Sequence, residues 1–300
     1  MNIVRSLSAV SKQAHGASVA LGNFDGLHLG HRAILEETLE RAKTLSVPAA
    51  VMTFEPHPRR FFSPHLPHLR LMRFREKIAM LAEMGFDTVF APHFNAALAA
   101  TTAGDFVEKI LHDTLGVRHV TTGEDFGFGA QRGGNRALLA SEAARLGFGY
   151  SAIAPVRQDV KIVSSTAIRE HLSGGDILAA NALLGHPYRI CGHVAHGDKR
   201  GRTLGFPTAN ISMAKLFLPR AGVYKVRVEG LGMGVANIGI RPTFGGGRPQ
   251  AEIHLFDFSG DIYGQYMRVE PLAFLRDEMK FSSPEALKEQ ILRDCEMAKL

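Results

Sequence analysis

The 300-residue chain has few cysteines and lacks long hydrophobic segments. Its two cysteines, Cys191 and Cys295, have neither metal-site nor redox-pair spacing, which argues against a disulfide framework and predicts a reducing compartment. No uninterrupted apolar run approaches the length needed to cross a bilayer. Met1 begins a polar segment rather than a charged start followed by an apolar core, so we expect no signal peptide. These absences predict a cytoplasmic protein without a membrane partner.

Dense runs of basic residues are also absent from the sequence. Lysine and arginine number 35 against 29 aspartates and glutamates, which gives a net charge of +6 at pH 7. This mild excess suits anionic substrates such as nucleotides. Nucleic-acid binding usually needs a dense basic run or a basic helix face, so we expect no nucleic-acid partner. The apolar content of 45% is ample for one large or two medium domains.

Up to about residue 185, strand-like and helix-like patterns alternate. Three of the helical patterns meet a glycine where a C-terminal cap belongs, at Gly85, Gly116 and Gly147. The alternation predicts a Rossmann-like, doubly wound parallel α/β domain over residues 1–185, with ligands at the carboxyl ends of its strands. The predicted strands are 18–21, 49–54, 87–91, 118–122 and 150–154, and the predicted helices are 32–44, 74–84, 104–115 and 135–146.

After residue 185 the pattern changes. Strand-length runs follow one another without intervening helices and are separated by glycine-rich turns, which predicts an antiparallel β-barrel domain over residues 186–300. Ser283 is a good N-cap and Pro284 fits a first helical turn, so one helix closes the chain. The predicted strands of this half are 223–229, 235–240, 251–258 and 266–271.

The most informative segment is GNFDGLHLGH, from Gly22 to His31, between the first predicted strand and the first predicted helix. Its glycines let phosphates approach the backbone, and helix-start amides favour an anion there. The imidazoles of His28 and His31 add donors at the same point. A lone histidine at a helix start is usually a cap or a surface residue, but the strand–turn–helix context favours a phosphate site.

A second candidate phosphate-binding segment spans residues 164–169. Ser164, Ser165 and Thr166 open a predicted helix, and Arg169 follows one turn later. Serine and threonine are ordinary N-caps. Three hydroxyls with free amides and a guanidinium also make a good clamp for a polyphosphate. Together with H-x-G-H, this segment resembles the nucleotidyltransferase superfamily.

These two motifs belong to a longer series that extends along both halves of the chain. They are GNFDGLHLGH (22–31), TFEPHP (53–58), GEDFGFG (123–129), SSTAIR (164–169), GRTLGFPTANI (201–211), GVYKV (222–226), ANIGIRPTF (236–244), EIHLFDFSGDIYG (252–264) and FLRDEMKF (274–281). In this order they resemble the prokaryotic bifunctional riboflavin kinase/FAD synthetase family over nearly the whole chain. One departure is Gly127, where members of that family often carry a basic or larger residue.

For the first domain, the resemblance implies adenylyl transfer, in which the FMN phosphate attacks the α-phosphorus of ATP to give FAD and pyrophosphate. The attacking oxygen is already anionic, so the site needs positioning and charge stabilisation. The resemblance assigns His28 and His31 to the α-phosphate, and Asp25 to orienting the turn or to water-mediated Mg²⁺. The implied ATP- and phosphate-binding residues are Gly22, Phe24, Asp25, Gly30, Ser164, Ser165, Thr166 and Arg169, and those near the flavin or nucleotide are Phe61, Phe62, Asp125 and Phe126.

For the second domain, the resemblance implies phosphorylation of the riboflavin 5′-hydroxyl by ATP. A primary alcohol needs a base, and Glu252 matches the family's base. Thr208 and Asn210 offer oxygen ligands for Mg²⁺. The implied ATP-binding residues are Lys199, Gly201, Arg202, Thr208 and Asn210, and the implied flavin-side residues are Phe274, Arg276 and Phe281.

Other interpretations of these residues are ordinary ones. A glutamate on an antiparallel strand is usually solvated, T-x-N is usually a turn, and two adjacent aromatics such as Phe61 and Phe62 often pack within a loop. Arg276 also fits a snorkelling side chain at a strand end.

Two other protein classes remain open. A class I aminoacyl-tRNA synthetase fragment would carry H-x-G-H together with a lysine-centred KMSKS-type loop, whereas this chain has SSTAIR at residues 164–169. A non-enzymatic flavin- or nucleotide-binding regulator is the other class, and turnover of riboflavin with ATP separates it from an enzyme. We expect a monomer or weak homo-oligomer that uses Mg²⁺ and acts on ATP, riboflavin and FMN.

Overall fold

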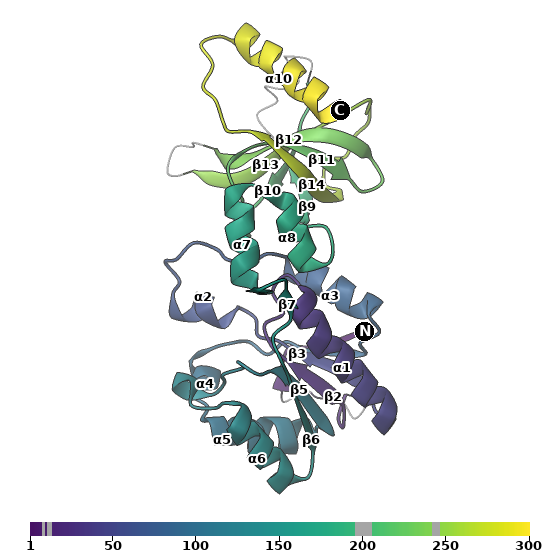
Figure 1. Ribbon diagram of the computed structural model, residues 1–300, viewed down its shortest axis with the longest axis vertical. Coiled ribbons are helices and arrows are strands. Elements are labelled where there is room, and N and C mark those ends of the chain that lie inside the picture. Colours follow the sequence, from purple (N-terminus) through teal and green to yellow (C-terminus); the bar gives the residue numbers. More distant parts are fainter. Residues whose placement is uncertain (8–9, 11–13, 196–205, 242–246) are drawn as a thin grey trace. The chain divides into compact units, whose positions relative to one another are not determined.

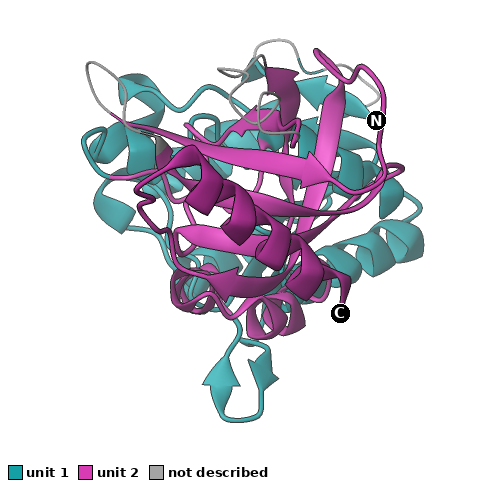
Figure 2. Ribbon diagram, turned by 90° about the horizontal axis from the view of Figure 1, so that it is seen from above, with its two compact units in different colours: residues 1–66, 74–163 teal, residues 67–73, 164–300 magenta. Residues whose placement is uncertain are grey.

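A computed structural model describes residues 1–7, 10, 14–195, 206–241 and 247–300 of the chain (Figure 1). The chain divides into two compact units, which Figure 2 colours separately. Unit 1 comprises residues 1–66 and 74–163, and unit 2 comprises residues 67–73 and 164–300. The domain boundary at residue 185 that the sequence indicates stays a prediction. Within the described part of the chain, no helix combines the length and apolar character that crossing a membrane requires.

Unit 1 is built on a six-stranded parallel sheet with strand order β1-β4-β3-β2-β5-β6. Parallel strands covered on both faces need apolar residues throughout, and β2, β3 and β4 are buried along their whole length. The strands are β1 (Asn2–Val4), β2 (Ser18–Leu21), β3 (Ala49–Met52), β4 (Thr88–Phe90), β5 (His119–Gly123) and β6 (Gly149–Ile153). The predicted doubly wound sheet is confirmed, and β1 is a strand that the sequence analysis missed.

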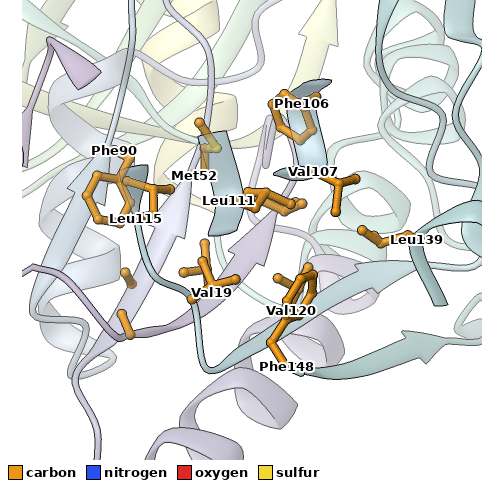
Figure 3. Close-up of a cluster of buried hydrophobic side chains, with 14 of the residues drawn as sticks. Val19, Met52, Phe90, Phe106, Val107, Leu111, Leu115, Val120, Leu139 and Phe148 are labelled. Carbon is orange, nitrogen blue, oxygen red and sulfur yellow. The ribbon is translucent and has the colours of Figure 1, made fainter. Parts of the chain in front are cut away.

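Helices cover both faces of this sheet. On one face, α1 (Leu29–Leu45) contacts β2, β3 and β5, and the Ser18 hydroxyl donates to the Thr38 carbonyl of α1. On the other face, Val19, Met52 and Val120 belong to the hydrophobic cluster of Figure 3. The other helical segments are α2 (Pro58–Phe62), α3 (Phe74–Glu83), α4 (Ala96–Ala99), α5 (Ala103–Asp105), η2 (Phe106–Thr114), η3 (Ala130–Arg132) and α6 (Arg136–Leu146).

The cluster in Figure 3 fills the space between the sheet and the helices η2 and α6. The predicted helix at residues 104–115 begins as α5 and continues as η2, a π-helical segment. Its apolar side supplies Phe106, Val107, Leu111 and Leu115 to the cluster, and α6 supplies Leu139. The hairpin formed by β7 (Arg157–Gln158) and β8 (Lys161–Ile162) precedes the end of the unit.

Unit 2 contains a closed antiparallel barrel with strand order β10-β13-β12-β11-β14-β9, as the sequence predicts. Alternate residues face the barrel interior, so apolar and polar positions alternate along its strands. The strands are β9 (Ile190–Ala195), β10 (Ala209–Ser212), β11 (Gly222–Val228), β12 (Gly232–Arg241), β13 (Arg248–Leu255) and β14 (Tyr266–Arg276). Strands β9 and β10 are absent from the sequence-based list.

A closing helix, α10 (Pro284–Lys299), packs against the barrel. Ser283 caps it as predicted, because its hydroxyl accepts from the Ala286 amide at 3.1 Å. The Arg276 guanidinium donates to both carboxylate oxygens of Asp294, at 2.8 and 2.6 Å, and Asp294 is buried. Breaking such a buried pair typically costs about 3–5 kcal/mol, so this contact secures α10 to β14.

Three further segments belong to unit 2. They are residues 67–73, α7 (Ser165–Gly174) and α8 (Ile177–Leu184). Arg73 donates to the carbonyls of Cys191 and Ser212. The Arg220 amide donates to the Leu172 carbonyl at 2.9 Å, and Leu172 is fully buried. These contacts join residues 67–73 and α7 to the barrel domain, and α8 packs against β14, so we expect both helices to stabilise the barrel.

A pair of fragments tests that stabilisation. Residues 186–300 lack α7 and α8, whereas residues 164–300 keep both helices and the contact of Leu172 with Arg220. We expect both fragments to form the barrel and the longer one to melt about 5 °C or more higher, because it retains buried apolar area. Circular dichroism melting curves measure the difference. Equal melting temperatures would show that α7 and α8 do not support the barrel.

Candidate active sites

The GNFDGLHLGH segment begins as a constrained turn after β2. Phe24 and Leu27 are fully buried and have positive φ angles of 47° and 45°. Residues other than glycine adopt this left-handed backbone conformation at a cost of about 1–3 kcal/mol, and they cluster at functional sites. A side chain at Gly22 would place its Cβ 3.0 Å from the Phe24 ring. The turn therefore has one defined backbone path.

The two histidines of this segment are stacked. Their ring centroids lie 3.5 Å apart with an interplanar angle of 16°. His28 is the N-cap of α1, and its Nδ1 accepts from the His31 amide at 3.2 Å. Because Nδ1 accepts, neutral His28 carries its proton on Nε2. His28 is thus the cap that the ordinary interpretation expects, and it also holds His31 in place.

The polar atoms of this segment are poised for a ligand. Burial, followed by the neighbouring charges of His28 and Lys77, holds the pKa of His31 well below its ordinary value, so the imidazole is neutral at pH 7. Within the described residues, the buried His31 Nδ1, Asn23 Oδ1 and Arg32 Nε atoms have no hydrogen-bond partner. Unsatisfied buried polar atoms are costly, so their concentration within one segment indicates a binding site.

The segment after β3 carries exposed aromatic rings. Phe61 and Phe62 of α2 are both exposed, and their centroids lie 5.5 and 5.8 Å from that of Phe94. Phe94 in turn packs edge-on against Phe54 at 5.7 Å. The two rings pack on Phe94 from helix α2 rather than within a loop, and they also present aromatic surface.

The GEDFGFG loop follows β5, next to β2 in the sheet. The sheet order reverses at β2 and β5, and ligands bind doubly wound sheets at such switch points. Phe126 stacks on Phe128 at 5.7 Å, and Asp125 is exposed. At Gly127, an added Cβ would lie 2.9 Å from Nη2 of Arg132. The Arg132 guanidinium therefore occupies the space that a larger residue at position 127 would take.

The SSTAIR segment belongs to unit 2, where it opens helix α7. Ser164 is the N-cap, and its hydroxyl accepts from the Ala167 amide at 3.2 Å. Ser165 is half-buried and Thr166 is exposed. The Arg169 Nε donates to the Leu69 carbonyl at 2.6 Å, so the guanidinium also anchors residues 67–73. That residues 164–169 and His28 bind the same ATP molecule stays a prediction.

In the barrel, strand register brings three polar residues into one row. Asn210 of β10 lies opposite Glu252 of β13, and Glu252 lies opposite Asn237 of β12. Directly opposed residues project to the same face of a sheet. The next row, with Ala209 and Ile253, is buried in the interior, so the polar row lies on the outer face.

The outer row has the chemistry of a Mg²⁺–phosphate site. Asn210 is 7% exposed, and its Oδ1 has no hydrogen-bond partner within the part of the chain that the structure describes. An oxygen acceptor without a hydrogen-bond partner suits a hard cation as its ligand. Thr208, two residues earlier in the chain, is half-buried and offers a hydroxyl oxygen. Gln250 Nε2 donates to Glu252 Oε1 at 2.5 Å. His254 contacts the Pro207 carbonyl at 3.0 Å, which steadies the entry to β10.

The described residues hold no group of three or more histidine, cysteine, aspartate or glutamate side chains that would bind a metal by themselves. Mg²⁺ commonly uses one or two protein ligands together with substrate phosphates and water. The donor set of Asn210 and Thr208 therefore fits an ion that arrives with ATP.

The predicted flavin-side residues of the barrel have structural contacts. Phe274 packs edge-on against Tyr224 at 5.3 Å, and the Arg220 guanidinium lies 4.3 Å from its ring centroid. Arg276 is paired with Asp294, and Phe281 is half-buried. Their flavin contacts stay predictions. The remaining predicted residues, Lys199, Gly201 and Arg202, lie outside the described residues.

Sequence reasoning missed several residues of these sites. Lys77 and Arg32 occur in amphipathic helical patterns, where a charge normally indicates a solvated face. Asn23 is part of GNFDG, but nothing in its residue type alone indicates a functional role. Asn237 lies in the ANIG motif, and only strand register brings it next to Glu252.

Comparisons with known proteins agree with this geometry. A family model described as FAD synthetase matches residues 10–167, and one described as riboflavin kinase matches residues 184–300. A bifunctional riboflavin kinase/FMN adenylyltransferase from Haemophilus influenzae is 43% identical over 303 residues, which cover 100% of this chain and 98% of that protein. The protein of the same name from Escherichia coli K12 is 41% identical over 299 residues, covering 98% and 96%.

A solved structure has the same fold over nearly its full length. It is described as a macrolide-efflux protein from Streptococcus pneumoniae, with a TM-score of 0.85, 28% identity, and coverage of 99% of this chain and 98% of that one. We take the architecture alone from this similarity. Given the two family models and the full-length relatives, the chain belongs to the bifunctional riboflavin kinase/FMN adenylyltransferase family.

Proposed function

We propose that this chain makes FAD from riboflavin in two ATP-dependent steps at two separate sites. Riboflavin and ATP give FMN and ADP at the outer face of the barrel, and FMN and a second ATP give FAD and pyrophosphate at the GNFDGLHLGH segment. One observation carries the proposal. Among the described residues, buried polar atoms that lack a hydrogen-bond partner lie at both of these sites. Asn210 Oδ1 lies in register with Glu252, and His31 Nδ1 lies in the stacked histidine pair.

In the adenylyl-transfer step, the FMN phosphate is the nucleophile and needs no base. The work of the site is to orient ATP and to stabilise charge at the α-phosphate. Neutral His31 and the imidazole of His28 offer N–H donors beside the N-terminus of α1, which favours an anion. Gly22, Phe24 and Gly30 are proposed to contact the phosphates through their backbone, and Asp25 is buried within the turn.

The remaining assignments for this step come from the family resemblance. Ser164, Ser165, Thr166 and Arg169 are proposed to hold the outer phosphates, and helix α7 favours an anion at its N-terminus. Phe61 and Phe62 are proposed to stack on the flavin, with Asp125 and Phe126 bordering the nucleotide.

In the kinase step, the proton of the riboflavin 5′-hydroxyl must leave as the oxygen attacks the γ-phosphorus. Glu252 is the proposed base, since it lies on the accessible outer row of the barrel. Asn210 and Thr208 are proposed to hold Mg²⁺, which neutralises phosphate charge when it is bound. Family membership removes the aminoacyl-tRNA synthetase interpretation. Separating the flavins by chromatography after incubation with riboflavin and Mg-ATP tests turnover against the regulator interpretation.

Loss of one histidine should affect only the second step. We expect His31→Ala or His28→Ala to lower FAD formation from FMN by about 100- to 1,000-fold, because one donor to the developing charge is lost. FMN formation from riboflavin should stay unchanged, as chromatography of the flavins would show. His112→Ala, an exposed histidine of the same unit, is the matched control. FAD formation near the wild-type rate in His31→Ala would place the site elsewhere.

Loss of the base should have the converse effect. Glutamine keeps the shape of Glu252 but accepts no proton, so Glu252→Gln should lower riboflavin phosphorylation by about 100- to 10,000-fold. Adenylylation of supplied FMN should continue, measured by chromatography of the flavins. Glu229→Gln, at an exposed carboxylate on the same barrel, is the matched control. Full kinase activity in Glu252→Gln would return Glu252 to an ordinary solvated strand position.

The oxygen of Asn210 can be tested through metal dependence. Asn210→Ala should raise the Mg²⁺ concentration for half-maximal kinase activity by about tenfold or more, because the buried oxygen ligand is removed. Asn210→Asp keeps an oxygen at the same position and should retain or lower that concentration. Kinase rates over a Mg²⁺ titration measure both variants. An unchanged Mg²⁺ requirement in Asn210→Ala would exclude the residue as a ligand.

A further inference from the structure

Lys77 of helix α3 is buried beneath the turn that follows β2. Lys77 is only 8% exposed, and its ammonium donates to the Asn23 carbonyl at 2.5 Å. The same ammonium lies 3.4 Å from the Thr53 hydroxyl, which itself donates to the Asn23 carbonyl at 3.2 Å. One backbone oxygen thus accepts from two side chains that come from α3 and from the end of β3.

Burying an ammonium is costly unless it is hydrogen-bonded, so the place of Lys77 calls for a function. A charge-assisted hydrogen bond is about twice as strong as a neutral one, and it fixes the direction of its acceptor. The peptide unit is planar and trans, so a fixed Asn23 carbonyl also fixes the Phe24 N–H, which points the opposite way. Lys77 therefore sets the plane of the peptide that enters the turn.

The orientation of this peptide affects the stacked histidines, because the peptide positions Phe24 and the Phe24 ring packs against His31. Phe24 has a φ of 47°, and its ring packs edge-on against His31 with centroids 5.3 Å apart. His31 in turn stacks on His28. The charge of Lys77 also contributes to lowering the pKa of His31. A chain of contacts thus runs from the ammonium through the turn to both imidazoles.

We propose that Lys77 is a positioning residue for adenylyl transfer, which holds the Asn23–Phe24 peptide so that the turn and the two histidines are aligned on the α-phosphate of ATP. The inference rests on the adenylyltransferase function proposed for unit 1. It assigns no substrate contact to Lys77, because the ammonium acts through the Asn23 carbonyl.

The test uses the full-length enzyme with Lys77→Met, Lys77→Arg and Thr53→Val. Lys77→Met should lower kcat for FAD formation from FMN by about 10- to 100-fold, the effect of a small misplacement of reacting groups. Lys77→Arg, which retains a cation, should recover part of the loss. Thr53→Val removes one donor to Asn23 and should give a smaller loss. Riboflavin phosphorylation should be unchanged in all three.

A stereochemical readout separates alignment from simple destabilisation. The Sp and Rp diastereomers of ATPαS differ only at the α-phosphorus, so the ratio of their kcat/KM values reports how that group is held. The ratio does not depend on the fraction of folded enzyme. We expect Lys77→Met and Thr53→Val to change it by about fivefold or more. Lys109→Met, an exposed lysine of unit 1 that pairs with Asp105, should leave it unchanged.

The outcomes are distinguishable. If wild-type enzyme makes no FAD from FMN and ATP, the function proposed for unit 1 is wrong. If wild-type enzyme makes FAD and Lys77→Met keeps the wild-type diastereomer ratio, only the role of Lys77 is wrong, even where kcat falls. If Lys77→Met does not fold, Thr53→Val decides, and an unchanged ratio in that variant overturns the proposal.

Discussion

The carbonyl of Asn23 is the point at which three elements of unit 1 are joined around the candidate adenylyl-transfer site. Lys77 and Thr53 both donate to it, and these residues join helix α3 and the end of β3 to the turn after β2. The turn contains two buried residues with positive φ, a conformation that persists only where its surroundings determine it. The stacked pair of His28 and His31 follows directly, so the geometry of the imidazoles depends on this buried hydrogen-bonded centre.

Unit 2 depends on a different constraint, the closure of its barrel. Closure fixes the register of every strand, and register brings Asn210, Glu252 and Asn237 into one outer row. Since side chains alternate between the two faces, a shift of one residue would turn this row into the core. The buried pair of Arg276 and Asp294 then fastens α10 to the same barrel.

The two sites match the demands of two reactions. An anionic FMN phosphate needs donors and alignment, which two imidazoles, helix-start amides and a constrained turn offer at the proposed site. A riboflavin hydroxyl needs a base and a cation beside the phosphates. At the proposed kinase site, a carboxylate is offered as the base, and amide and hydroxyl oxygens are offered as ligands for the cation. Each unit also has a cluster of buried hydrophobic side chains of its own.

The sequence alone determined the parallel sheet, the barrel, the closing helix and the motifs, because periodicity, caps and glycine positions are local properties. It did not determine that Lys77 would be buried on the Asn23 carbonyl, since a lysine in an amphipathic helix normally faces water. Likewise, Phe274 and Arg276 match a flavin motif, but only packing with Arg220 and Asp294 shows their structural contacts. Tertiary structure decided these points because burial and strand register join residues far apart in the chain.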